Sequence, residues 1–491
     1  MKIASMLRLR QRGHVDLADR VTDIPVEKIG ATLTPNLRAL RLAMTVSDVL
    51  LSMGITASSV VSKVLDITET FCDQPVHINI TADIITISQM RGIEREPLTL
   101  VRPATVRDIN MMTLQSVQHL VYEIRTGKHT LASAEKALDQ ILSEPITYPK
   151  WVPPLASSLI APAVALMFTT NWHVILITFL IAVVLDLLLD ALARKAVVPF
   201  FRQAAAGALV TLAAAAMAWL AREHVRFFNG IDTTLIVVGG IFMLLSGLAI
   251  VGAVQDALEE YYVTASSRIL RVLMLTGGIV MGILVGLYAA RKLGIGIAVS
   301  PNPLQLALLR YQVIGGAAAA AAFALATQTR LRAILWAGLV GGCSLGVMYI
   351  FRDDFSMSVV PATGIAAVFV GLVASLFSRL WRTPSYGITA AGIIPLVPGL
   401  SLYTGLMQLV SYPPGDPLFF RGVGTMFTVA GIALAIAAGA SFGTMLGRPL
   451  YRHVSRARNL EPFVNYMRLQ VRADSKKASK FMHFIPRRPA E

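Results

Sequence analysis

Apolar residues are distributed unevenly along this chain, and they gather into long runs between about Val152 and Gly447. That stretch holds 26 Asp, Glu, Lys or Arg residues, whereas the first 150 residues hold 33. A bilayer core about 30 Å thick takes roughly 20 apolar helical residues to cross, which is the length of most of these runs. The pattern predicts a polytopic α-helical membrane protein with about ten transmembrane helices. The ten runs are 153–169, 172–192, 198–221, 233–254, 269–290, 304–327, 331–350, 357–377, 386–410 and 421–447.

The residues before the first run predict a small α+β domain. Apolar positions recur at helical spacing over 40–53, 58–72, 109–124 and 131–142. Alternation over 76–81 and 84–87 predicts a β-hairpin, with a third strand at 97–101. Residues 1–36 are polar and contain Pro25 and Pro35, which interrupt any long helix. The expected division is a flexible arm (1–36), a cytoplasmic α+β domain (37–150), two transmembrane halves of five helices each (151–290 and 291–447) and a basic cytoplasmic tail (448–491).

The distribution of charge predicts the side of the membrane on which the termini lie. The net charge is +15, yet the first 150 residues nearly balance, while the tail after Gly447 carries 11 basic and three acidic residues. This concentration beside the last run indicates contact with a lipid bilayer and not with nucleic acid. The first 30 residues lack the pattern of a signal peptide. The loops on the side of the amino terminus hold nine basic residues and the opposite loops six, so we expect both termini in the cytoplasm.

Ten crossings divide into five plus five at the connection 291–303. Because five is an odd number, the second half begins on the opposite side of the membrane from the first. This is the arrangement of an inverted repeat, which many secondary transporters share. The prediction rests on the count of runs.

Pro395, Pro398 and Gly399 lie in the middle of the ninth run. Proline removes a backbone donor and breaks a helix, so this run should unwind inside the membrane. Irregular backbone at that depth is tolerated where protein buries it or where it lines a cavity, as in transporter binding sites. A passive kink is the alternative.

A second unusual segment, at positions 255–268, follows the fourth run. Asp256 could attract an ammonium group or carry a proton, and Arg268 could hold a carboxylate through two hydrogen bonds. Hydroxyl groups nearby could cap the fifth helix. The alternative is an ordinary capped cytoplasmic loop. The candidate substrate or coupling residues here are Gln255, Asp256, Thr264, Ser266 and Arg268.

Asp186 and Asp190 lie four positions apart in the second run, hence on one face of a helix. Ionisable groups inside a membrane usually face a bundle interior, so Asp186 is a candidate for a proton or cation relay. Arg194 follows Asp190 by one turn, which is also typical of a helix end at the membrane interface. Paired glycines at 239–240, 277–278, 315–316 and 341–342 favour close helix packing over a role in lining a pocket.

Enzymatic motifs are absent from the sequence. It contains no glycine-rich phosphate loop with its lysine, and its eight histidines and two cysteines show no spacing typical of metal ligands. No serine or threonine has a recognisable histidine and acid partner. We therefore expect no enzyme activity, no cofactor and no metal site.

Four segments resemble the threonine/serine exporter family in its fused form, a soluble domain followed by ten helices. They are Ser47–Gly54 with Ser58 and Ser59, the hairpin around Asp83–Ser88, Gln255–Asp256 with Val263–Arg268, and Gly392–Leu400. The resemblance covers about residues 37–450. It implies export of L-threonine and L-serine, driven by the proton gradient, across the cytoplasmic (inner) membrane of a bacterium. The chain departs from the family at 259–262, where Glu-Glu-Tyr-Tyr stands in place of glycine and proline.

The sequence thus predicts a secondary exporter of small polar amino acids, with its site between the halves near Asp256, Arg268 and the broken ninth run. A channel-like or scaffold membrane protein, regulated through its cytoplasmic domain, is the alternative. Association of the chain with further copies of itself stays open.

Overall fold

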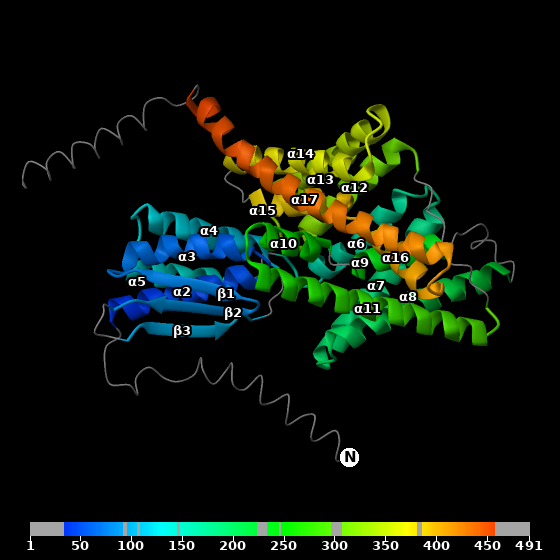
Figure 1. The fold of residues 1–491 in the computed structure, drawn as a ribbon, viewed down its shortest axis with the longest axis horizontal. Coiled ribbons are helices and arrows are strands. Elements are labelled where there is room, and N and C mark those ends of the chain that lie inside the picture. Colours follow the sequence, from blue (N-terminus) through cyan, green and yellow to red (C-terminus); the bar gives the residue numbers. More distant parts are fainter. Residues whose placement is uncertain are drawn as a thin grey trace, which may run out of the picture.

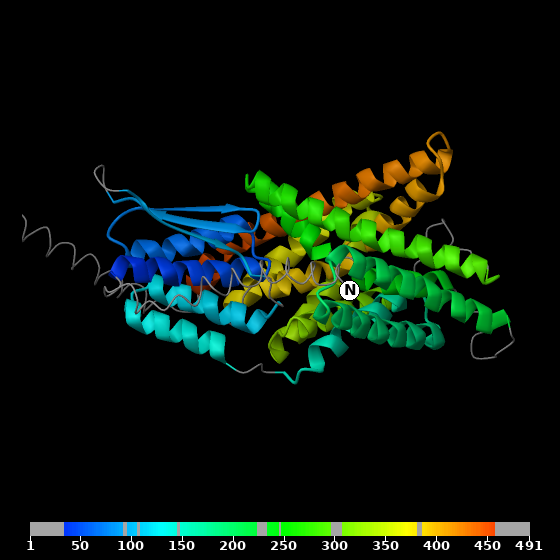
Figure 2. The same cartoon turned by 90° about the horizontal axis from the view of Figure 1, so that it is seen from below.

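The structure is a computed structural model that describes residues 34–91, 96–105, 109–144, 148–222, 233–244, 247–295, 307–380 and 385–456. An amino-terminal domain, residues 34–144, lies at one end of a long helical bundle, residues 152–456 (Figures 1 and 2). Residues 1–33 of the expected arm (1–36) and residues 457–491 of the expected tail (448–491) lie outside the described residues.

The amino-terminal domain contains four helices and one three-stranded sheet. Strands β1 and β2 pair antiparallel with Val76 opposite Gln89, and β2 pairs antiparallel with β3, so the order is β1-β2-β3. The hairpin predicted from alternation is present, and its two-residue turn places Ala82 at a φ of 55°. The elements are α2 (Pro35–Ser52), α3 (Ala57–Phe71), β1 (Val76–Thr81), β2 (Ile84–Gln89), β3 (Leu98–Pro103), α4 (Met111–Arg125) and α5 (Leu131–Ser143).

Local sequence explains where these helices begin. Thr34 caps α2 by accepting the Leu37 N–H, and Pro35 occupies the first helical position, where its missing donor costs nothing. Pro35, which we expected to interrupt any long helix within the arm, thus stands at the start of α2. Asn110 caps α4 and Thr130 caps α5 in the same way.

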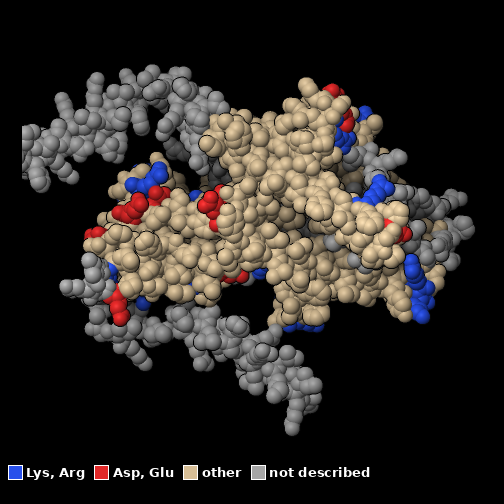
Figure 3. Space-filling model, in the orientation of Figure 1, with Lys and Arg blue, Asp and Glu red and all other residues tan. Residues whose placement is uncertain are grey.

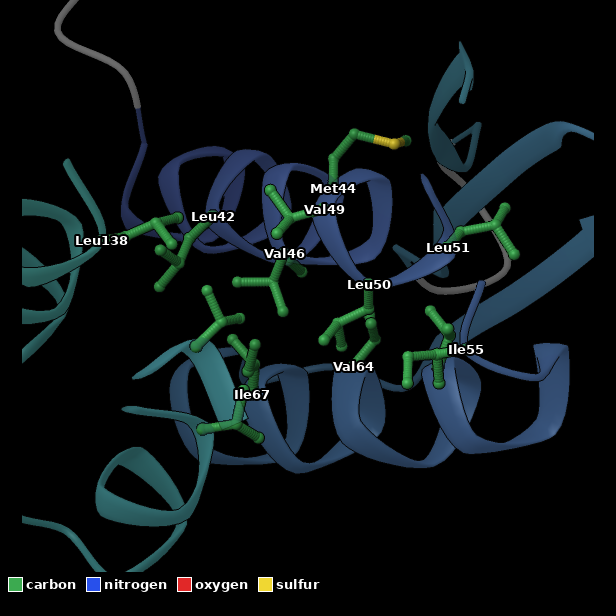
Figure 4. Close-up of a cluster of buried hydrophobic side chains, with 14 of the residues drawn as sticks. Leu42, Met44, Val46, Val49, Leu50, Leu51, Ile55, Val64, Ile67 and Leu138 are labelled. Carbon is green, nitrogen blue, oxygen red and sulfur yellow. The ribbon is translucent and has the colours of Figure 1, made fainter. Parts of the chain in front are cut away.

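One hydrophobic core holds the domain together. Leu50 of α2 faces Val64 of α3 across the helix pair, Ile67 of α3 lies opposite Val46 of α2, and all four are fully buried (Figure 4). Ile85 and Ile87 extend this core from the inner face of the sheet, while His77 and Asn79 are exposed on its outer face. Burial of such large aliphatic side chains stabilises the fold by about 1.5–3 kcal/mol each.

The bundle is that of a multi-pass membrane protein. Seven of its helices are long and apolar enough to cross a bilayer, and three shorter apolar helices occupy the remaining runs, so the number ten stays a prediction. Charged side chains gather on the amino-terminal domain and toward the ends of the bundle, with a broad uncharged band between them (Figure 3). The elements are α6 (Val152–Leu166), α7 (Trp172–Arg194), α8 (Pro199–Arg222), α9 (Thr233–Leu244), α10 (Gly247–Leu258), α11 (Tyr262–Lys292), α12 (Leu309–Ala326), α13 (Leu331–Tyr349), a π turn η3 (Ile350–Asp354), α14 (Val359–Leu380), α15 (Ser385–Ile393), a 3₁₀ turn η4 (Ile394–Leu396), α16 (Gly399–Ser411) and α17 (Pro417–Arg456).

Two glycine seams join parallel helices. In α11, glycines at 278, 282 and 286 meet backbone carbonyls at 200, 204 and 208 of α8. In α17, glycines at 439, 443 and 447 meet those at 364, 368 and 372 of α14. Small residues spaced by four let helix backbones approach closely in lipid, which is the packing role expected for the glycines.

The two seams correspond residue by residue. The glycines of α17 lie 161 positions after those of α11, and their partners in α14 lie 164 positions after those in α8. The same two shifts relate the reverse contacts, since Gly207 of α8 meets Ile279 O and Gly371 of α14 meets Ala440 O. One packing pattern therefore occurs in each half of the bundle.

The first helices of the two halves, α6 and α12, pack against each other in opposite directions. Ala307, just before α12, donates its N–H to Met167 O, just after α6, at 2.9 Å. Gly315 brings α12 close to Ala163 O of α6. Corresponding helices of the two halves thus run antiparallel where they meet.

Replacing Gly282 or Gly443 by alanine is expected to force a seam apart. The new Cβ would lie 1.9 Å from Ala204 O or 2.2 Å from Val368 O. We expect each variant to lose about 1–3 kcal/mol of unfolding free energy, measured as loss of monodisperse protein on heating in detergent. Alanine at Gly277 or Gly424 of the same helices is the control, because a Cβ there meets no atom within 4 Å. Equal heat sensitivity of all four variants would contradict the seams.

Candidate functional site

The ninth apolar run is divided by a break. Helix α15 ends at Ile393, η4 forms one tight turn, and α16 begins at Gly399. Val397, between the two prolines, has extended backbone angles. The unwinding predicted from Pro395, Pro398 and Gly399 is therefore confirmed, and the first amides of α16 are left without partners inside their own helix.

Both halves of the bundle pack around this break. Ile394 shares a hydrophobic cluster with Ala163 and Val164 of α6, and Leu396 shares another with Val251 of α10. Pro395 lies against Gly316 of α12 and Gly341 of α13, where Cβ atoms would stand 3.3 and 3.5 Å from its ring. The segment Ile394–Leu396 thus lies between the halves, where protein covers the irregular backbone.

The first half contains a helix boundary at the equivalent position, which our sequence analysis missed; residues 245–246, between the two helices, lie outside the described residues. Helix α9 ends at Leu244 and α10 begins at Gly247, each 152 positions before the end of η4 and the start of α16. The sequence signal was available, because Gly-Ile-x-x-Leu-x-x-Gly-Leu occurs at both 240–248 and 392–400. Without proline, the first copy resembled a continuous transmembrane run.

Asp256 lies at the end of α10 and is fully buried. Its Oδ1 accepts the N–H of Ala57, the first residue of α3, at 2.8 Å. Its Oδ2 stands 2.6 Å from Arg268 Nη1 as an ion pair, and Arg268 Nη2 donates to Ile55 O at 3.2 Å. Thr56 provides no side-chain cap for α3, so the carboxylate of Asp256 supplies the negative charge at that helix end.

The rest of the 255–268 segment also meets the amino-terminal domain. Thr264 accepts the N–H of Ala82 and donates to Ile80 O, at 3.2 Å each. Ser58 donates to Glu259, and Tyr261 packs on the domain's core. Two other side chains bond to residues nearby in the chain. Gln255 Nε2 donates to Glu259, just past the end of α10, and Ser266 Oγ donates to Val263 O in α11.

The structure therefore assigns Asp256 and Arg268 different neighbours from those expected. Within the described residues, neither forms a hydrogen bond or ion pair with the Pro395–Gly399 segment. Under the same correspondence of halves, their positions in the second half are held by Gln408 and Val429. The ion pair therefore has no counterpart at these positions of the second half. It occurs in the first half, where the hairpin between α10 and α11 contacts the amino-terminal domain.

Asp186 and Asp190 lie on α7, as expected. Asp190 is exposed and accepts from Arg194 at 2.5 Å, which fits a helix end. Asp186 is half-buried, and no described residue forms a hydrogen bond or ion pair with it. Asp186 therefore remains a candidate proton or cation relay because of its position within the helix.

A narrow crevice lies where the amino-terminal domain meets the second half. Met111 and Gln115 of α4 face Thr329, Arg330 and Ala333 at the start of α13, with Gly387 and Ile388 of α15 beside them. The crevice has room for little more than a water molecule. Among the residues that the structure describes, no group of three His, Cys, Asp or Glu side chains is placed to hold a metal ion.

Comparison with known proteins finds two matching family models. The threonine/serine exporter model ThrE matches residues 41–289, and one described as "Threonine/Serine exporter, ThrE" matches residues 312–446. The "Probable threonine/serine exporter" of Mycobacterium tuberculosis is 28% identical over 425 residues, 84% of this chain and 77% of that protein. The "Threonine/serine exporter" of Corynebacterium glutamicum is 29% identical over 430 residues, 86% of this chain and 84% of that protein. No solved structure matches.

Asp256→Ala tests the attachment of the domain, because it leaves Arg268 and the Ala57 N–H without their buried partner. We expect a loss of about 3–5 kcal/mol at this contact. Hydrogen–deuterium exchange of a peptide over residues 55–60 should then accelerate by about a hundredfold. Asp190→Ala removes an exposed carboxylate from its ion pair with Arg194 and should leave this exchange unchanged. Unchanged exchange in Asp256→Ala as well would show that the carboxylate does not hold α3.

Proposed function

Because the chain belongs to the threonine/serine exporter family, we propose that it is a secondary active exporter of L-threonine and L-serine, driven by the proton gradient. The names of both relatives support this substrate class. We place the protein in a bacterial cytoplasmic membrane, with ten spans and both termini in the cytoplasm. The amino-terminal domain contacts the segment at 255–268 and the turn at 327–329. This supports the orientation, because the loops on the side of the amino terminus hold more basic residues than the opposite loops.

The observation that carries the mechanism is the pair of broken helices at equivalent positions. We infer that the two halves form an inverted repeat related by an axis through the α6–α12 contact. The matching seams, the matching divisions at Leu244–Gly247 and Leu396–Gly399, and the antiparallel first helices all support this inference. In such repeats the substrate lies between the halves, and access alternates as one half rocks against the other.

The amino ends of α10 and α16 suit a zwitterionic amino acid. A helix amino terminus offers unpaired N–H donors and about half a positive charge, which favours the substrate carboxylate. Carbonyl groups released where α9 and η4 end can accept from the substrate ammonium group. Gly247 and Gly399 begin the two helices and present no side chain that would keep a carboxylate from the backbone.

The candidate coupling residues lie outside these breaks. Asp186 is half-buried in a transmembrane helix, which is the usual position of a proton carrier. Gln255 and Asp256 lie at the end of α10, and Thr264 and Arg268 lie near the start of α11. We propose that they couple the amino-terminal domain to transport.

The double variant Pro395→Ala, Pro398→Ala should allow α15 and α16 to approach one helix. We expect counterflow of labelled L-threonine in reconstituted vesicles to fall by about tenfold or more, because binding groups are displaced. Pro413→Ala, Pro414→Ala removes two exposed prolines between α16 and α17 and is the matched control. Equal counterflow in both variants would contradict the proposed site. A flux that rises linearly with the concentration of L-threonine would identify a channel.

The Asp186→Asn variant should separate substrate exchange from transport that is driven by the proton gradient. Counterflow needs no net proton movement and should persist, whereas efflux stimulated by an imposed proton gradient should fall to the level without a gradient. Asp190→Asn, one turn away, should keep both activities. Gradient-stimulated efflux in Asp186→Asn equal to that of the unmodified protein would exclude Asp186 as the proton carrier.

A further inference from the structure

The amino-terminal domain is bound to both halves of the bundle, and it is bound to them by different chemistry. It meets the first half at the hairpin between α10 and α11. It meets the second half at the turn between α12 and α13 and at the start of α15. Figure 1 shows α10 and α15 at the end of the bundle that faces the domain.

The contact with the first half is charged and buried. Asp256 is fully buried between Ala57 N–H and Arg268, and Arg268 reaches across to Ile55 O. Tyr261 completes the domain's own core. Separation here would leave a carboxylate and a helix end without partners, which is costly in a buried place. Glu260, with a φ of 68°, holds the hairpin in a conformation unfavourable for its residue type.

The contact with the second half has Arg330 at its edge, but its hydrogen bonds join neutral groups. Met111 N–H donates to Thr327 O at 2.9 Å, and Tyr148 OH to Thr329 O at 2.8 Å. Asn110 Nδ2 donates to Gln328 Oε1 at 3.0 Å. Each of these groups can exchange its partner for water at small net cost, because neutral hydrogen bonds are nearly balanced by those to solvent.

We propose that the amino-terminal domain is a cytoplasmic gate that stays attached to the first half and releases from the second half during transport. This rests on the proposed function, since rocking of the halves requires that one of the two contacts opens. The neutral contact at 327–329 opens, and the crevice between Met111 and Gly387 widens into the cytoplasmic entrance. The start of α15, which leads into the break at Pro395, lies next to this contact, beside Met111.

Paired cysteines can test which contact opens. In a background with Cys72 and Cys343 replaced by alanine, Asn110→Cys with Gln328→Cys bridges the contact with the second half. Ser58→Cys with Glu259→Cys bridges the contact with the first half and is the matched control, because each pair replaces two side chains that share one hydrogen bond. A short bis-methanethiosulfonate reagent cross-links each pair in reconstituted vesicles, and a reductant reverses it.

Cross-linking the 110–328 pair should lower L-threonine counterflow by about tenfold, with recovery on reduction, while cross-linking the 58–259 pair should change it by less than about twofold. Counterflow unaffected by either cross-link, or abolished by both, would overturn the gate. Spin labels on the same pairs give a readout that does not depend on the substrate. The gate requires a second, longer distance for 110–328 and a single distance for 58–259, and a single short distance in both pairs would overturn it. Absence of threonine and serine counterflow before cross-linking would reject the proposed substrates, and the spin-label distances would still decide the gate.

Discussion

Backbone groups that leave a helix inside hydrocarbon must find partners in the protein, and this constraint shapes the bundle. A break exposed to lipid would leave several donors and acceptors unpaired, at a cost of several kcal/mol each. The break at Pro395–Gly399 is instead enclosed by α6, α10, α12 and α13. Each half covers a part of it, so the irregular backbone lies in the interface that a rocking motion would open.

Glycine seams determine which parts of the bundle can move. Backbone contacts between α8 and α11, and between α14 and α17, bring helices so close that sliding would create clashes along the seam. Each seam therefore makes one rigid pair within its half. Around the break, the contacts between halves are made of aliphatic side chains such as Ile394 and Leu396, which can repack, whereas α6 and α12 meet at close backbone contacts. Rigid halves and an adaptable interface are the mechanical requirements of alternating access.

Sequence reasoning located elements whose signal is local. Alternation identified the hairpin at 76–89, and proline identified the break at Pro395–Gly399, because both effects act within a few residues. The break between Leu244 and Gly247 carries no proline, so only comparison of the two halves could reveal it. Asp256 was expected at a substrate, yet its partner Ala57 lies 199 positions away. A buried charged side chain requires a partner, but the sequence does not show which distant segment provides that partner.

The central claim is that the substrate lies between two equivalent broken helices. An electron cryo-microscopy map of the protein with saturating L-threonine tests it most directly. The account predicts density for the amino acid between the amino ends of α10 and α16, near Gly247 and Gly399, with its carboxylate toward these helix ends. Density confined to the surroundings of Asp256 and Arg268, or to the crevice beside Met111, would contradict it.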